Sequence, residues 1–204
     1  MSSFRTALPL IENNAATERQ LQVLEAVKKR YGMVPNTYRA MANEPAVVDT
    51  YLFGMGKLIK ESGLSMAELD VVFLTISFEN ACDYCVAAHS FTADTLSKLS
   101  PDVTNAIREG REIADPKLKA LATATRAVLN KRGRPEPTDL EAFFAQGYTE
   151  RHLLSVVLAI SLKTLTNYTN HLFDTPVDAM FKAREWSAFQ MELKVANFFR
   201  KTAG

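Results

Sequence analysis

The chain has 204 residues, a formal net charge of +1, 47% hydrophobic residues and 23% charged residues. These values are typical of a soluble globular protein, built as one large domain or as two small repeats. A net charge so close to zero gives no electrostatic attraction for nucleic acid or an anionic membrane, so we expect neither partner. The sequence contains no signal-peptide pattern and no apolar run of about 18 residues, and two cysteines are too few for a secreted disulfide framework. We therefore expect a cytoplasmic protein.

The first part of the chain is predicted to be an arm followed by a helix. Residues 1–16 are expected to be extended. From Thr17, apolar residues recur at steps of three and four positions, which predicts a helix that stops at Gly32.

Two prolines indicate the next helices. Pro35 and Pro45 occupy positions typical of the first turn of a helix. We therefore expect a short helix and then a longer one that runs to Ser62, with Gly63 at its C′ position.

The segment after Gly63 can be interpreted in two ways. Ser65 and Glu68 form a capping box, S-x-x-E, which predicts the start of a helix. The run VVFLTISF alone would also fit a buried strand, and a strand leading into a Cys-x-x-Cys helix would suggest a thioredoxin. The capping box, the length of the segment and the helical spacing of its apolar residues favour a helix. These apolar residues are Leu69, Val72, Phe73 and Ile76.

The segment ENACDYCVAAHS contains both cysteines of the chain, Cys82 and Cys85, and His89. On a helix, these three side chains lie at i, i+3 and i+7 on one face. Two thiols near a helix N-terminus are exposed to backbone N–H groups and to the macrodipole, which lower a thiol pKa below about 8.5. His89 is one turn from Cys85 but about 10 Å along the axis from Cys82, so it can serve only Cys85 as a base or proton carrier. The pattern predicts a reactive dithiol.

We expect the cysteine helix to begin at about Ala81 or Cys82, with Asn80 as its N-cap, and to run to about Leu99. Glu79 is expected to be a first-turn or surface carboxylate.

Further helices are predicted in the second half of the chain. Pro101 and Pro116 each open one, and KRGRPEP reads as a charged, solvated loop. Thr138 and Glu141 then form a second predicted capping box.

The two cysteines could also belong to a haem c site or a structural zinc site, or could be inert. A haem c site needs histidine directly after the second cysteine, and Val86 stands there, so this site is excluded. A structural zinc site usually needs four ligands, and one Cys-x-x-Cys with His89 leaves the fourth to Glu79 or to a distant histidine. Two inert buried cysteines are a further possibility, because free cysteine is among the most buried residue types. Redox chemistry is favoured, and we expect no bound cofactor and no resident metal.

The sequence also suggests an internal duplication of a helical unit. A shift of 84 positions aligns residues 63–87 with residues 147–171, so that GLSMAELDVVFLTISFENACDY meets GYTERHLLSVVLAISLKTLTNY. Thr166 and Thr169 stand at the cysteine positions in the second copy, which we therefore expect to be scaffold or a pocket wall. The two remaining histidines are expected to be structural or surface residues; they are His152 and His171.

The end of the chain is rich in large apolar residues that something must cover. Packing against the chain's own core is favoured over wrapping around a neighbouring subunit. The residues concerned are Met180, Phe181, Trp186, Phe189, Val195, Phe198 and Phe199.

Three stretches together resemble the carboxymuconolactone decarboxylase superfamily, and within it the alkylhydroperoxidase D-like, peroxidase-related branch. They are the VPN segment, the motif AELDVVFLTISFENACDYCVAAHS and the segment NYTNHLFDTPVD. The resemblance implies a single all-α domain, residues 1–204, with a family-like core over residues 17–178 and an extension over residues 179–204. It also implies a homo-oligomer, a trimer or hexamer with a dimer as a further possibility, and a thiol-dependent peroxidase. The decarboxylases of the superfamily lack the cysteine pair, which disfavours their activity here.

The resemblance also assigns roles to residues. Family members carry a glutamate twelve residues before the first cysteine, in a proton relay through the histidine to the second cysteine. That position is Asp70 here, and Glu68 is the alternative, which would point about 200° away on a helix. The implied catalytic residues are Cys85, Cys82, His89 and Asp70.

In the implied reaction, Cys85 attacks a hydroperoxide and Cys82 condenses with the sulfenic acid to form a disulfide. An external dithiol or a thioredoxin- or lipoyl-type reductant then attacks Cys82, which we expect to lie nearer the mouth of the helix. The alternatives are a disulfide reductase or electron-transfer adaptor with little peroxidase activity, and a metal-binding or structural oligomer.

Overall fold

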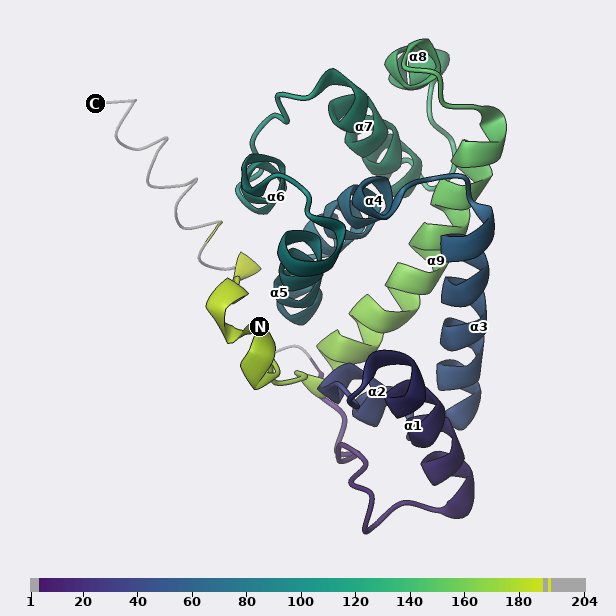
Figure 1. Cartoon of the computed structure of the whole chain (residues 1–204), viewed down its shortest axis with the longest axis vertical. Helices are drawn as coiled ribbons and strands as arrows, with labels where there is room; N and C mark the ends of the chain where they lie inside the picture. The colour runs from purple at the N-terminus through teal and green to yellow at the C-terminus, as the bar shows by residue number, and fades with distance from the viewer. Residues whose placement is uncertain (1–3, 189–190, 192–204) are drawn as a thin grey trace, which may run out of the picture.

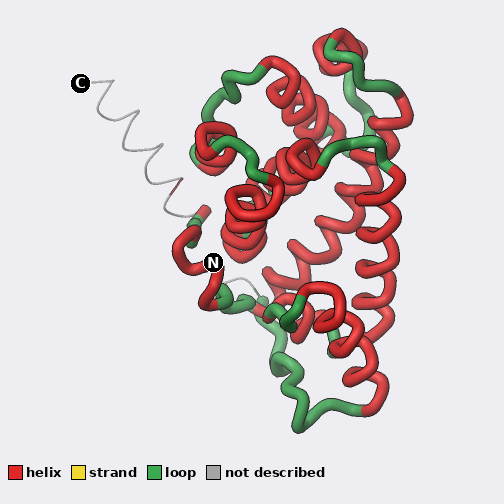
Figure 2. The backbone as a smooth tube through the Cα atoms, viewed as in Figure 1, coloured by secondary structure: helices red, strands yellow, loops and turns green. Residues whose placement is uncertain are grey.

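The structure is a computed structural model that describes residues 4–188 and 191. All regular secondary structure in this part of the chain is helical, as Figure 2 shows. The predicted all-α class is therefore confirmed. None of the described helices is both long enough and apolar enough to cross a membrane.

The first half of the chain holds five α-helices and one π-helical turn. After an extended arm, the helices are α1 (Glu18–Tyr31), α2 (Asn36–Met41), α3 (Pro45–Glu61), α4 (Met66–Glu79) and α5 (Asp83–Thr92), followed by the π-helical turn η1 (Ala93–Ser97).

The second half, as far as the structure describes it, adds four α-helices and a 3-10 turn. These are α6 (Pro101–Arg108), α7 (Pro116–Asn130), α8 (Pro137–Ala145) and the long α9 (Glu150–Phe173), and then η2 (Ala179–Arg184).

Helix α4 is the centre of the bundle. Every residue from Glu68 to Ser77 is buried, because an apolar run without a polar face can be stable only when it is covered on all sides. Helices α5, α6, α7 and α9 pack around it, as Figure 1 shows. Because α4 precedes the cysteine segment directly, it fixes where that segment starts.

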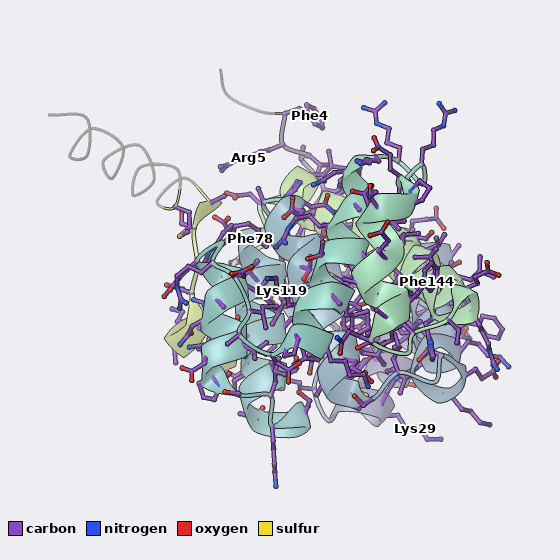
Figure 3. All side chains as sticks on the ribbon, turned by 90° about the horizontal axis from the view of Figure 1, so that it is seen from above. Phe4, Arg5, Lys29, Phe78, Lys119 and Phe144 are labelled. Carbon is purple, nitrogen blue, oxygen red and sulfur yellow. The ribbon has the colours of Figure 1, made fainter. Side chains whose placement is uncertain are left out.

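Helix α9 runs beside α3 along one side of the molecule (Figure 1). The two approach closely at Gly54, where an added Cβ would lie 2.6 Å from Leu162 Cδ2. Side chains fill the spaces between the helices, while Phe4 and Lys29 project outward (Figure 3).

Most of the predicted helix signals are confirmed. Thr17 and Ser65 cap α1 and α4 through capping boxes, and Pro45 lies in the first turn of α3. Gly32 ends α1 with a positive φ of 78°, a conformation that costs glycine little. The run VVFLTISF is helical, which excludes the thioredoxin alternative.

Two local predictions in the flanking helices are wrong. Pro35 is the N-cap of α2 and not a first-turn residue. The capping box of α8 is formed by Glu136 and Asp139, two residues before the predicted pair. A proline at the first helical position, Pro137, sets the start of this helix ahead of Thr138.

The proposed duplication stays a prediction. Ser65 and Thr149 both cap their helices, and Gly63 and Gly147 both have positive φ. However, α9 continues without a break past the positions at which α4 ends.

Candidate active site

The connection from α4 to α5 differs from the prediction and decides where the cysteines point. Asn80 ends α4, and its side chain donates to Asn167 Oδ1 at 2.9 Å. Ala81 takes a left-handed conformation, with φ at 52°, and Cys82 is the N-cap of α5. Cys82 therefore precedes the helix, whereas Cys85 lies within its first turn.

The end of the cysteine helix also differs from the prediction. The α-helix stops at Thr92, and the chain continues as η1 to Ser97 before Leu99. The hydrogen bond from the Leu99 amide to the Ala93 carbonyl, 3.0 Å long, closes this wider turn.

A cavity of about 270 Å³ lies beside α5. Its polar side chains include Asp70, Cys85, His89 and Lys163, whereas Cys82 is not part of its wall. The rest of the wall is mostly aromatic, methionine and aliphatic, including Tyr31, Met33, Tyr38, Tyr51, Met55, Ile59, Met66, Phe73, Tyr84, Phe91, Leu96, Met180 and Phe181. An apolar molecule that enters this cavity meets one thiol, that of Cys85.

Cys85 is in an environment that favours the thiolate. Burial opposes ionisation, but a hydrogen bond from Cys82 and the neighbouring Lys163 and His89 outweigh it. Asn170 Nδ2 also donates to the Cys85 sulfur at 3.2 Å. Together these groups hold the pKa of Cys85 well below its ordinary value of 9.0.

Cys82 is in the opposite environment. Its side chain is 1% exposed and packs in an apolar cluster with Phe181 and Val177 of the C-terminal segment. Burial, the hydrogen bond with Cys85 and the charge of that thiolate raise the pKa of Cys82 far above 9.0. Cys82 is therefore a protonated thiol that donates to the Cys85 sulfur.

His89 lies between a carboxylate and an ammonium group. Its Nδ1 is 3.8 Å from Asp70 Oδ1, and its Nε2 is 2.6 Å from Lys163 Nζ. Burial and the charge of Lys163 lower the pKa of His89 below 6.5, against the opposing effect of Asp70. Phe73 packs against the imidazole, with ring centroids 5.1 Å apart.

The two candidate carboxylates of α4 face different surroundings. Asp70 is 3% exposed and lines the cavity, and Thr92 Oγ1 donates to its Oδ1 at 3.3 Å. Glu68 instead accepts from Ser65 and Tyr148 and pairs with Lys117. Burial would raise the pKa of Glu68, but these donors lower it to about 2. The geometry thus places Asp70 beside His89 and Glu68 in a helix cap.

The other residues singled out in the sequence lie away from the thiols or cover them. Glu79 binds Arg126 and Asn130, His152 completes the cap of α9, and His171 is exposed. Phe181 is buried against Tyr84 and Phe91, and Trp186 is half-buried against Phe78, so both pack on the chain itself. The remaining large apolar residues of the tail, from position 189 on, lie outside the described residues.

No cluster of three or more His, Cys, Asp or Glu side chains arranged as metal ligands is found among residues 4–188 and 191.

Two residues of the site were not predicted from the sequence, Lys163 and Asn170, both on α9. They are 1% and 4% exposed, respectively. A signal for them exists in the sequence: they continue the buried stripe of α9 at alternating steps of three and four positions. The buried positions on this stripe are Val156, Ala159, Lys163, Thr166 and Asn170.

Comparisons with protein-family models and with curated protein sequences find no match. Solved structures do match. A peroxidase-related protein of Ralstonia eutropha JMP134, described as an alkylhydroperoxidase AhpD core, has a TM-score of 0.73 and 20% identity, covering 85% of this chain and 93% of that one. A peroxidase-related protein of Silicibacter sp. TM1040 has a TM-score of 0.70 and 19% identity, covering 87% and 93%.

A third match is a Cys-to-Ala variant of the debrominase Bmp8 in complex with 2,3,4-tribromopyrrole. Its TM-score is 0.69 and its identity 17%, over 90% of this chain and 97% of that one. The chain therefore has the alkylhydroperoxidase AhpD-like fold that the resemblance of its cysteine motif implied.

Proposed function

We propose that the protein is a thiol-dependent peroxidase that reduces organic hydroperoxides. The Cys85 thiolate attacks the terminal peroxide oxygen, the O–O bond breaks, and Cys85 becomes a sulfenic acid. The Cys82 thiol then condenses with it, releasing water and forming the Cys82–Cys85 disulfide. A relay that includes His89 and Asp70 serves the proton transfers.

One observation carries this proposal: of the two cysteines, the one that faces the cavity is the one whose surroundings favour a thiolate. Cys85 meets the cavity with a lowered pKa, and Cys82 donates to it from behind. A nucleophile needs access and charge, whereas a resolving cysteine needs only proximity. The apolar wall suits a hydroperoxide with an alkyl or aryl body.

The acidity of the two thiols determines which sulfur of the disulfide is attacked during reduction. An external dithiol, such as a thioredoxin or a lipoyl group, is expected to attack Cys82, because Cys85 is the more acidic thiol and leaves more readily. The sequence analysis placed Cys82 nearer the mouth of the helix, but it lies under Phe181 and Val177. The reductant can therefore reach Cys82 only when this covering segment moves.

Free thiols and intact mass test the proposal. The reduced protein is treated with one equivalent of cumene hydroperoxide. We expect rapid loss of both thiols and a mass decrease of about two hydrogens, as a disulfide requires. Thiols that persist would refute the proposal and favour the alternatives, disulfide exchange with a protein partner or a structural or metal-binding role.

A second candidate function is reductive dehalogenation of a small aromatic compound. The aromatic wall of the cavity and the fold match to a debrominase support it. The two thiols would supply two electrons, so that a bromoarene yields the arene, bromide, a proton and the disulfide. Bromide release from 2,3,4-tribromopyrrole by the reduced protein, without a response to cumene hydroperoxide, would favour this function.

We also propose a homo-oligomer, supported by an apolar stripe on α9. The stripe consists of Leu154, Leu158, Leu165, Tyr168 and Leu172, with Ser161 as its one polar position, and its steps alternate between four and three, the spacing of a coiled-coil seam. Leu154 is 70% exposed, Tyr168 55% and Leu172 47%. Light scattering should report a trimer, hexamer or dimer that dissociates when Leu154 and Leu158 are both changed to glutamate; a wild-type monomer would contradict this proposal.

A further inference from the structure

Lys163 is a buried lysine in direct contact with the predicted catalytic histidine. Its side chain is 1% exposed, it lines the same cavity as Cys85, and its Nζ is 2.6 Å from His89 Nε2. The sequence motifs predict no role for this residue. Because a lysine is seldom fully buried unless it has a partner, its place here needs an explanation.

The contact links the protonation states of the two groups. A lysine ammonium has three donors and no acceptor, so His89 Nε2 must be the acceptor of this hydrogen bond. The imidazole is then neutral and carries its proton on Nδ1, which faces Asp70 Oδ1 at 3.8 Å. Both ring nitrogens of His89 are thus directed at neighbours other than Cys85.

The ammonium group also needs a negative charge nearby. No carboxylate lies within ion-pair distance of Lys163 Nζ in the part of the chain that the structure describes. Asp70 lies on the far side of the imidazole. The cavity wall also holds Cys85, whose ionisation Lys163 favours ahead of His89.

We propose that Lys163 is the proton donor of the site, and that neutral His89 holds and aims its ammonium group. This inference rests on the proposed peroxidase function and changes which residue carries the proton. When the Cys85 sulfur bonds to the terminal oxygen of R–O–OH, the O–O electron pair leaves with the alkoxide. Lys163 gives this alkoxide its proton, so that R–OH departs and a neutral amine remains. After the external dithiol restores both thiols, the Cys85 thiol returns a proton to Lys163.

Other titratable groups face this trio from the surrounding helices. Asp70 comes from α4 and Cys82 from the connection before α5. Burial raises the pKa of Tyr51 on α3, of Tyr84 on α5 and of Tyr38 on α2 well above the ordinary value of 10.0, so these phenols stay neutral. Of the side chains that line this cavity, Lys163 is the one with an ammonium group.

A comparison of two oxidants of similar size can show whether Lys163 donates a proton or has only a structural role. Cumene hydroperoxide releases an alkoxide that needs a proton, whereas perbenzoic acid releases a carboxylate that does not. We compare the rates of Cys85 oxidation by both in the wild type, in Lys163→Met and in Lys163→Arg. Methionine removes the charge at similar volume, and arginine keeps a charge but cannot give up its proton.

We expect the ratio of the cumene hydroperoxide rate to the perbenzoic acid rate to fall about 100-fold in both variants, as for the loss of a general acid. Lys117→Met serves as the matched control, because Lys117 pairs with Glu68 and should leave the ratio unchanged. Damage to the fold would slow both oxidants alike, and circular dichroism would reveal it.

A wild-type ratio in Lys163→Arg and Lys163→Met would overturn the assignment of Lys163. The proposed function, and this inference with it, would be overturned if iodoacetamide alkylates Cys85 of the wild type but neither oxidant oxidises it. Alkylation shows that Cys85 is accessible and reactive, so a lack of oxidation in the wild type counts against the peroxidase function, whereas an unchanged ratio in the variants counts against Lys163 alone.

Discussion

The surroundings of Cys85 and Cys82 differ more than three residues of separation would suggest. Cys85 lies in the first turn of α5, faces a cavity and has Lys163, His89 and Asn170 around it. Cys82 lies just before the helix, under an apolar cover. The pKa of the first thiol is lowered and that of the second is raised. The difference teaches that a Cys-x-x-Cys motif supplies two sulfurs, while partners from distant parts of the chain decide which thiol has the lowered pKa.

The most severe test of this difference is Cys85→Ser. Serine keeps the size of the side chain but is not ionised, so no nucleophile remains at the cavity. We expect peroxide consumption to be abolished, measured as the loss of cumene hydroperoxide in the presence of dithiothreitol. Retained turnover in this variant would remove Cys85 from the reaction.

Cys82→Ser should have a different and smaller effect. Serine still offers a hydrogen-bond donor to the Cys85 sulfur, so the first oxidation should proceed, but no disulfide can form. We expect a single oxidation that leaves a sulfenic acid on Cys85, trapped by dimedone and located by peptide mass spectrometry. The absence of an adduct would mean that Cys82 does more than resolve.

The two carboxylates of α4 offer a matched pair. Asp70→Asn removes the charge that faces His89, and we expect the rate of Cys85 oxidation to fall about tenfold, less than for a direct proton donor. Glu68→Gln weakens a capping box and should cost about 1 kcal/mol of stability with little change in that rate. Stopped-flow oxidation and thermal unfolding measure the two effects. Equal rate losses would mean that the relay is not localised at Asp70.

A further consequence of the lowered Cys85 pKa is a dependence of stability on pH. Because the pKa of Cys85 is lowered in the folded state, the unfolded chain binds more protons between that lowered value and 9.0. Stability from this group should therefore rise with pH across this window, by up to about 1.4 kcal/mol per pH unit, and be lost as pH falls through the folded pKa. Urea unfolding of the reduced wild type should show this rise, and Cys85→Ser should lack it. If the unfolding free energies of the wild type and Cys85→Ser changed with pH in parallel, the thiolate would not be stabilised in the folded state.

Much of the fold could be predicted because its signals are local. The capping box at Ser65 and Glu68 depends on residues three positions apart, and the helical spacing after it is readable without a partner. The choice of Asp70 over Glu68 rested on the family resemblance, while helix geometry indicated only that both could not face the thiols; the structure places Asp70 beside His89.

The missing part of the site depends on contacts far apart in the sequence. Asn80 could not be recognised as the end of α4, because its partner, Asn167, belongs to α9. Cys82 has the extended conformation of an N-cap, so its side chain leaves the face that it would share with Cys85 on a continuous helix. Lys163 becomes part of the site only when α9 packs across α5.

The most direct measurement of the central claim is alkylation of each cysteine as a function of pH. The reduced protein is exposed to iodoacetamide between pH 4 and pH 10, and Cys82 and Cys85 are quantified by peptide mass spectrometry after unfolding and a second label. We expect Cys85 to react first and to keep reacting well below pH 9, with Cys82 protected throughout. Faster labelling of Cys82, or a Cys85 profile with the pKa of an ordinary thiol, would contradict the account.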